Sequence, residues 1–244
     1  MKDLSALYPW SGRKRKKKTR RPLTLLKRLV VIGLAATVLP VVVLRWVPPP
    51  TTAFMLQKSI QARWNGLKDY KTRYRWTDWR NISPHAAQAV MAAEDQKFPV
   101  HWGFDPHSIA EAWEERRKGE RIRGASTITQ QVAKNLFLWP GKSFVRKGIE
   151  AYITVLIETI WTKRRILEVY LNIAEFGRGV FGIAAASETF YKKTPDRLTR
   201  TQSALLAAAL PNPRQLRIDR PSPYMRARAG WILNQMNQLN PPAF

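Results

Sequence analysis

The sequence contains no cysteine and only three histidines among its 244 residues. A disulfide scaffold and a Cys-ligated structural zinc site are therefore excluded, and His85, His101 and His107 show no spacing typical of a metal site. Acidic residues are also scarce, since 17 Asp or Glu face 42 Lys or Arg, for a net charge of +25. Such an excess predicts an anionic partner: nucleic acid, phospholipid headgroups or a phosphorylated substrate.

The chain also lacks the motifs of a transpeptidase domain. Its S-x-x-K match of note, Ser11 to Lys14, lies in the basic N-terminal run, and no K-T-G is present. No internal repeat or low-complexity segment follows that run. About 195 residues follow the apolar segment near the N-terminus, which is enough for one domain with its own core.

One uncharged apolar stretch stands between two basic flanks. Residues 29–44 carry no charge, and the segment before Leu29 holds eleven Lys or Arg and one acid. This pattern predicts a transmembrane helix at 29–47, a cytoplasmic tail and an exported C-terminal part. The alternative is a cleaved signal peptide, but Val47 and three prolines follow where an A-x-A site would stand. A membrane segment directly after the basic run argues against a nucleic-acid partner.

The remaining periodicity predicts a mainly α fold, because apolar residues recur at helical spacing and few segments alternate with period two. Ser83 and Ser126 are predicted helix caps, and Thr201 is predicted to cap a helix that Pro211 ends. The predicted organisation is a tail at 1–28, the membrane helix at 29–47, a stiff Pro-rich linker and membrane-proximal segment at 48–80, and a domain at 81–244. Within this domain, helices are predicted at 83–93, from 126, at 143–161, 164–176, 204–210 and 223–239.

A first motif, E-D-Q-K-F-P-V-H-W-G-F-D, runs from Glu94 to Asp105. Glu94 ends an Ala-rich helix and precedes several aromatic side chains, among them Phe98 and Trp102. Desolvation by such neighbours would raise the pKa of the carboxyl and suit it for general-base catalysis. The alternative is a surface acid at a helix end.

A second motif, G-A-S-T-I-T-Q-Q-V-A-K-N-L-F-L, runs from Gly124 to Leu138. Hydroxyl groups and free backbone N–H groups at a helix N-terminus form an anion site. Ser126 and Thr127 are therefore predicted binding residues. Gln130 with Lys134, and Gln131 with Asn135, are predicted to lie on two adjoining stripes of the same helix and to bind as well. Lys142, Arg146 and Lys147 are predicted to form a basic wall suited to a diphosphate. The alternative is a capped amphipathic helix.

Three further acids lie in mostly apolar surroundings. Glu150 is four residues after Arg146 and three after Lys147, a spacing that favours a salt bridge on a helix face. Glu158 and Glu175 are interpreted as structural acids.

Together these motifs resemble glycosyltransferase family 51 of bacterial cell-wall synthesis. The chain matches that family's E-D-x-x-F-x-x-H-x-G at Glu94 to Gly103, G-x-S-T-I-x-Q-Q-x-x-K-N at Gly124 to Asn135, R-K-x-x-E at Arg146 to Glu150 and R-I-L-E-x-Y-L-N at Arg165 to Asn172. The likeness covers about residues 82–213. It implies a lysozyme-like helical domain with a small lobe that touches the membrane.

The resemblance also implies an activity, the polymerisation of lipid II at the bacterial inner membrane, with lipid II, the growing glycan and membrane lipids as partners. Glu94 would be the base, and Lys134, Lys142, Arg146 and Lys147 would stabilise the pyrophosphate leaving group. Glu150 would orient these cations or a divalent cation; no other cofactor is expected. Other cell-wall or division proteins are further expected partners. Two alternatives stay open: a membrane-anchored lytic enzyme and a non-catalytic scaffold.

Overall fold

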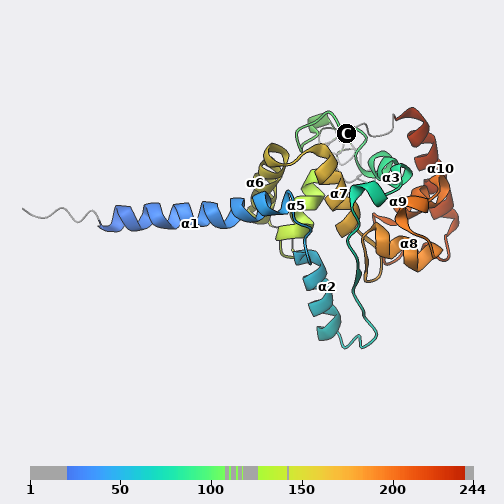
Figure 1. Cartoon of the computed structure of the whole chain (residues 1–244), viewed down its shortest axis with the longest axis horizontal. Coiled ribbons are helices and arrows are strands. Elements are labelled where there is room, and N and C mark those ends of the chain that lie inside the picture. The colour runs from blue at the N-terminus through green and yellow to red at the C-terminus, as the bar shows by residue number, and fades with distance from the viewer. Residues whose placement is uncertain are drawn as a thin grey trace, which may run out of the picture. The chain divides into compact units, whose positions relative to one another are not determined.

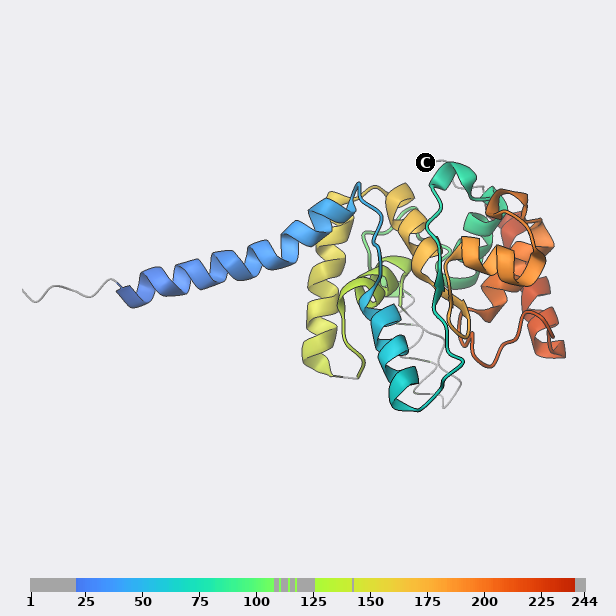
Figure 2. The same ribbon diagram turned by 60° about the horizontal axis from the view of Figure 1, so that its bottom comes forward.

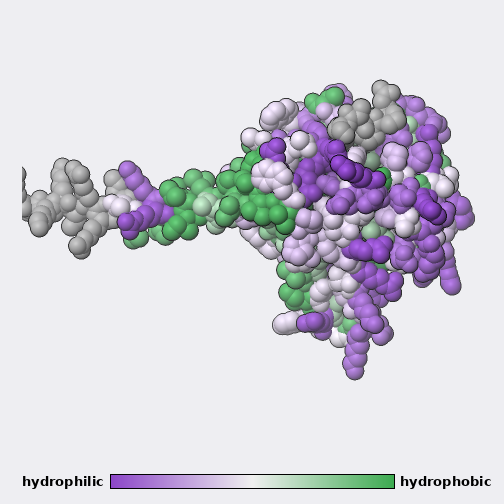
Figure 3. Space-filling model, viewed as in Figure 1, coloured by the Kyte–Doolittle hydropathy of each residue, from purple (hydrophilic) through white to green (hydrophobic). Residues whose placement is uncertain are grey.

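The computed structural model describes residues 21–107, 110, 114, 117, 126–141 and 143–239, and divides the chain into two units, Met1–Leu39 and Pro40–Phe244. The first unit contains most of helix α1 (Arg21–Leu44), along which Figure 3 shows hydrophobic side chains. The window Lys27–Leu44 has a mean hydropathy of 2.1 and is 6% buried, so α1 is long and apolar enough to cross a membrane. The predicted cytoplasmic tail lies largely outside the described residues.

The second unit is built from helices, which confirms the mainly α fold class (Figure 1, Figure 2). Helices α3, α9 and α10 pack against one another, and α5 packs against α2, α6 and α7. The helices are α2 (Ala53–Trp64), α3 (Pro84–Glu94), α5 (Ile128–Phe137), α6 (Phe144–Ile160), α7 (Lys163–Ile173), α8 (Ile183–Tyr191), α9 (Arg200–Ala209) and α10 (Pro223–Gln238), with short 3-10 turns η1 (Trp79–Asn81) and η2 (Pro195–Arg197).

Helix α7 lies at the centre of the core. Seven of the eight residues from Ile166 to Ile173 are buried, whereas most surface helices bury one stripe only. The largest fully buried side chains around it include Tyr170, Phe98, Phe176 and Phe181. A helix enclosed in this way is a rigid support for the side chains of the helices that pack on it.

A small sheet follows α7, where the sequence predicted continued helix to Phe176. Strands β1 (Arg73–Tyr74), β2 (Glu175–Gly177) and β3 (Val180–Phe181) form a sheet of order β1-β3-β2, with β1 parallel and β2 antiparallel to β3. The helical prediction was wrong here because tertiary bonds end α7. The Asn172 side chain bonds both the N–H and the carbonyl of Thr77, and a Cβ at Gly182 (φ 82°) would lie 2.3 Å from the Asn172 carbonyl oxygen.

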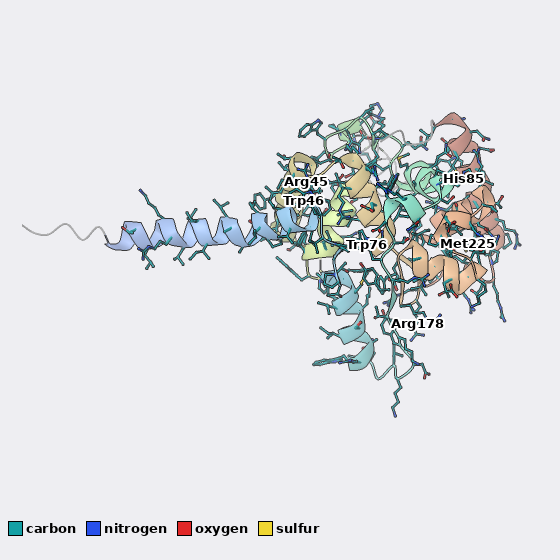
Figure 4. The ribbon with its side chains drawn as sticks, in the orientation of Figure 1. Arg45, Trp46, Trp76, His85, Arg178 and Met225 are labelled. Atoms are coloured by element: carbon teal, nitrogen blue, oxygen red, sulfur yellow. The ribbon has the colours of Figure 1, made fainter. Side chains whose placement is uncertain are left out.

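The end of α1 belongs to the second unit and is bonded to it. Val41 is buried, and its carbonyl accepts the indole N–H of Trp161 at 2.7 Å. Arg165 of α7 donates to the carbonyls of Leu44 and Val47, both at 3.0 Å. Arg45 and Trp46, next to these carbonyls, are labelled in Figure 4.

The Pro-rich segment after α1 is also in contact with the unit. The Tyr74 hydroxyl donates to the carbonyl of Pro49 at 2.6 Å. The segment predicted to be a stiff spacer is therefore bonded to the folded part of the chain.

Candidate active site

Glu94 lies at the C-terminal end of α3, which Asp95 terminates by leaving helical geometry (φ −163°, ψ 80°). The Glu94 side chain is 14% exposed; its Oε2 accepts a hydrogen bond from Gln131 Nε2 at 2.9 Å, and Arg228 Nη2 lies 4.0 Å from Oε1. Burial raises the pKa of Glu94, while Gln131, Arg228 and Lys134 oppose that rise. A carboxylate balanced in this way suits general-base catalysis.

The predicted rise in the pKa of Glu94 is confirmed, but the two aromatic residues of the first motif differ in exposure. Phe98 is fully buried in the core, but Trp102 is 74% exposed and contributes little to any enclosed site. The polar residues of the motif have a clearer place. His101 Nε2 lies 2.9 Å from both carboxylate oxygens of Asp95, and its Nδ1 accepts the N–H of Gly103 at 3.0 Å. The proton of the imidazole therefore faces Asp95.

The two motifs are joined by hydrogen bonds. Asp95 Oδ2 accepts the backbone N–H of Ile128 at 2.9 Å, and the Thr127 hydroxyl donates to the Gly103 carbonyl at 2.7 Å. Asp95 is thus a negative charge at the first turn of α5, where the helix dipole favours it. These bonds fix the start of α5 beside the end of α3.

The prediction that Ser126 caps α5 was wrong by one residue, because Thr127 has the extended backbone and the side-chain bond of a cap. Thr127 and Gln130 form a capping box: the Thr127 hydroxyl accepts the N–H of Gln130, and the Gln130 side chain accepts the N–H of Thr127. Both residues are buried. Their polar groups are used within the protein and hold α5 in place, while Ser126 offers its carbonyl to Gln131 at 3.5 Å.

Gln131 connects Glu94 to the core. Its Nε2 donates to Glu94, and its Oε1 accepts the hydroxyl of the buried Tyr170 at 3.2 Å. Because Tyr170 fixes which end of the amide carries the oxygen, the amide N–H is directed at Glu94. Asn135, one turn further along α5, is buried and lines the same region.

The basic residues gather around Lys134 and Glu150. Burial lowers the pKa of Lys134, and Glu150 is the largest influence that raises it. Glu150 is 3% exposed and accepts bonds from Arg146, at 3.1 Å, and from Lys147. The predicted salt bridge is therefore confirmed; the side chains of Glu150 and Arg146 are largely buried, whereas that of Lys147 is 50% exposed. Lys142, the other predicted cation, lies outside the described residues.

Two cavities meet at Lys134. The larger, about 960 Å³, runs past Arg146 along α2 and is lined mainly by apolar groups, including Phe54, Ile60, Trp64, Leu138 and Trp139. The smaller, about 290 Å³, has polar walls that include Gln131, Asn135 and Tyr170. The half-buried ammonium group of Lys134 thus adjoins one apolar and one polar compartment, and Gln131, which bonds Glu94, lines the polar one.

Several contributors to this site escaped the sequence interpretation. Arg228 lies on α10 and Tyr170 on α7, while Lys58 on α2 and Glu175 on β2 line the polar cavity. Tyr170 lies in the R-I-L-E-x-Y-L-N segment, which has no recognisable spacing toward Glu94, and the other three residues belong to none of the motifs. Only the tertiary packing of separate elements brings them together, so no local signal could have identified them.

Comparison with known proteins gives consistent matches. The transglycosylase family model matches residues 61–237. The chain is 49% identical over 219 residues to the biosynthetic peptidoglycan transglycosylase of Pseudomonas entomophila, covering 90% of this chain and 92% of that protein. Proteins of the same name from Salmonella arizonae (50%, covering 91% and 94%) and Escherichia coli O127:H6 (54%, covering 81% and 82%) are similarly close. On this match and these identities, the chain belongs to the transglycosylase family.

Proposed function

We propose that the protein is a membrane-anchored peptidoglycan glycosyltransferase that polymerises lipid II into β-1,4-linked glycan chains and has no transpeptidase activity. The observation that carries this proposal is the pairing of Glu94 with Lys134. The Glu94 carboxylate, whose pKa is raised by burial, lies within electrostatic reach of the half-buried Lys134 ammonium group, which lines both an apolar and a polar cavity. Such an arrangement supports proton abstraction beside a lipid-linked anion.

In the proposed reaction, Glu94 removes the proton from the 4-hydroxyl of the N-acetylglucosamine at the acceptor end. The freed oxygen forms a bond to the anomeric carbon of the lipid-linked growing chain, and the bond from that carbon to the pyrophosphate oxygen breaks. The configuration inverts from α to β, and the electron pair leaves with undecaprenyl pyrophosphate. Glu94 then returns its proton to solvent. The hydrogen bond from Gln131 directs the carboxylate during this step.

The cations are proposed to stabilise the charge that develops on the pyrophosphate. Lys134 and Arg146 line the apolar groove, and Lys147 is held with Arg146 by Glu150. Fixed cations in a partly buried site interact more strongly with a developing charge than cations in water do. Glu150 would act through these cations rather than on the reacting atoms.

The donor set at Glu150 also bears on a divalent cation. Both of its carboxylate oxygens are used by Arg146 and Lys147, and the described part of the chain gathers no cluster of three His, Cys, Asp or Glu side chains. We propose that Glu150 serves as the anchor of the two cations. A divalent cation near the pyrophosphate would be held by phosphate oxygens rather than by a protein cage.

The apolar groove is proposed to hold the start of the prenyl chain. Its walls include Ile60, Trp64 and Trp139, all of which are exposed large apolar residues, and Phe144 nearby in the sequence is 99% exposed. Exposed apolar surface of this kind is typical of a site that contacts a membrane or a lipid. The pyrophosphate would then bind at Lys134 while the lipid leads away along α2.

The location proposed for this chemistry is the outer face of the bacterial inner membrane. The basic segment before Leu29 favours a cytoplasmic N-terminus, and the folded unit that follows α1 would then be exported. Lipid II and membrane lipids are the proposed partners there, and other cell-wall proteins remain a prediction from the family resemblance.

Incubation of the purified full-length protein with labelled lipid II tests the proposal. We expect glycan polymer and undecaprenyl pyrophosphate as products. A lytic enzyme would instead shorten preformed glycan, and a scaffold would do neither. Cleavage of preformed glycan, or the absence of polymer from a folded preparation, would reject the glycosyltransferase assignment.

A further inference from the structure

The polar cavity is lined by one acid, Glu175, that the proposed reaction does not use. Glu175 of β2, Lys58 of α2 and Arg214, which follows α9, line this cavity together with Gln131 and Lys134. The sequence interpretation made Glu175 a structural acid. Its position beside two residues of the reaction centre calls for a different explanation.

Glu175 is buried but has few partners. Its side chain is 5% exposed, and the β2–β3 turn, which carries the Arg178 labelled in Figure 4, brings the N–H of Gly179 to Oε1 at 3.1 Å. Arg214 Nε lies 3.9 Å from the same oxygen, beyond hydrogen-bond distance. Burial raises the pKa of Glu175 as the largest influence on it. Within the described part of the chain, no hydrogen bond reaches Oε2.

Two other acids of this protein with little exposed surface have partners on both carboxylate oxygens. Glu168 accepts the Trp79 N–H at 2.7 Å with one oxygen and the Arg165 guanidinium at 2.8 Å with the other. Glu150 uses both oxygens in ion pairs. Burial of a carboxylate is costly without such partners, so buried acids that only support a fold are usually paired on both sides. Among the described residues Glu175 has no hydrogen-bond partner on Oε2, and Glu175 lines the polar cavity.

We propose that Glu175 is a specificity-determining residue that accepts hydrogen bonds from the hydroxyl or acetamido N–H groups of an N-acetylated sugar ring bound in the polar cavity. This inference rests on the proposed function. An ionised carboxylate is an acceptor only, and sugar hydroxyl and amide N–H groups are the donors it lacks. The volume of about 290 Å³ is at the lower end of ligand pockets, which fits a single ring.

The cavity combines three cations with one carboxylate, a mixed lining with which a neutral ring can pair on both sides. Lys58, Lys134 and Arg214 are cationic, but an anion bound among them would also lie beside the buried carboxylate of Glu175. A neutral sugar can instead accept from the cations and donate to the acid at the same time. Because Gln131 lines the cavity and also bonds Glu94, the ring would be one adjacent to the bond being formed.

The test compares Glu175→Gln with Glu188→Gln in the full-length protein. Glu188 is an exposed acid on α8 outside both cavities, so it controls for the change of charge and of size. We expect Glu175→Gln to lower kcat/KM for lipid II by about tenfold or more, the usual effect of losing a hydrogen bond to a charged group. Inhibition by undecaprenyl pyrophosphate, which has no sugar, should be unchanged.

The outcomes separate the two proposals. If the wild-type protein makes no polymer, the proposed function fails. If the wild type is active and Glu175→Gln matches Glu188→Gln, the inference about Glu175 is overturned. Equal loss of lipid II turnover and of inhibition by undecaprenyl pyrophosphate would also overturn it, because Glu175 would then serve the anion site or the fold. If the Gln variant does not fold, Glu175→Asp, which keeps the charge but withdraws the carboxylate, is measured in the same two assays, lipid II turnover and inhibition by undecaprenyl pyrophosphate, with the same expected results.

Discussion

Asp95 and Ile128 are thirty-three residues apart, and a hydrogen bond of 2.9 Å joins the carboxylate of the first to the backbone N–H of the second. The residue after Glu94, the proposed base, thus holds the first turn of the helix that carries Gln131 and Lys134. The acid at the second position of the E-D motif is a positioning residue for the whole site.

Asp95→Ala should therefore lower both stability and activity. The N–H of Ile128 and the ring of His101 lose a charged partner in a buried place, so we expect a loss of about 2 kcal/mol in the free energy of unfolding. For a domain of this size that corresponds to a fall of about 4–8 °C in the midpoint of thermal unfolding. Asp69→Ala, at an exposed position, is the control. An unchanged midpoint would show that the bond does not stabilise the junction.

Glu94→Gln should separate activity from stability. Removal of the base should slow polymerisation by at least about a hundredfold. The burial that raises the pKa of Glu94 makes the folded state bind its proton more tightly, so wild-type stability falls as pH rises from the ordinary carboxyl pKa through the raised one. Above that window the Gln variant should unfold at the same temperature as the wild type or a higher one. Turnover equal to wild type would remove Glu94 from its role.

Arg228→Ala should change the pH dependence of catalysis. The rate should fall as pH drops through the pKa of Glu94, because the base must be ionised. Arg228 lowers that pKa, so its loss should move the acidic limb of kcat/KM to higher pH. Arg226→Ala, an exposed arginine on the same helix, should leave the limb in place. A limb that moves to lower pH, or does not move, would contradict this arrangement.

Lys134→Ala should weaken the binding of a phosphoglycolipid inhibitor such as moenomycin. If the ammonium group contacts the anion of the inhibitor, the affinity should fall by about tenfold or more, at low and at moderate salt alike. Lys68→Ala, at an exposed lysine outside both cavities, should have little effect. Equal affinities for wild type and Lys134→Ala, with equal helical content, would take Lys134 out of the anion site.

A fusion of alkaline phosphatase after Phe244 tests the topology. The basic segment before Leu29 predicts that the C-terminal part is exported, so the enzyme should be active in that fusion. A protein whose mature N-terminus lies near Pro48 would instead indicate a cleaved signal peptide, and an inactive fusion would indicate the opposite orientation.

Much of the helical fold could be predicted because local signals mark its ends. The last helix, predicted at 223–239, is α10 at Pro223–Gln238, and the helix predicted at 143–161 is α6 at Phe144–Ile160. Both begin after a serine whose side chain caps the first turn. Thr199 rather than Thr201 caps α9, because its capping box with Gln202 has the required spacing.

The errors fall where distant segments decide the local structure. Apolar periodicity continues past Ile173, but Asn172 is bonded to Thr77, and Glu175 begins a strand instead of a further turn. The residues of the candidate site likewise fall into those that the sequence predicts and those that it does not. Glu94 and Gln131 lie in motifs that the sequence displays, whereas Arg228 and Glu175 join them only through packing across the fold.

Lys134, like Lys58, lines both cavities, and this shared ammonium group makes them electrostatically dependent on each other. An anion in the apolar groove satisfies part of its charge and changes how strongly it holds an oxygen in the polar cavity. By thermodynamic reciprocity, an occupant of the polar cavity changes the affinity of the groove by the same factor. The two compartments therefore form a coupled pair, in which departure of one occupant alters how firmly the other is retained.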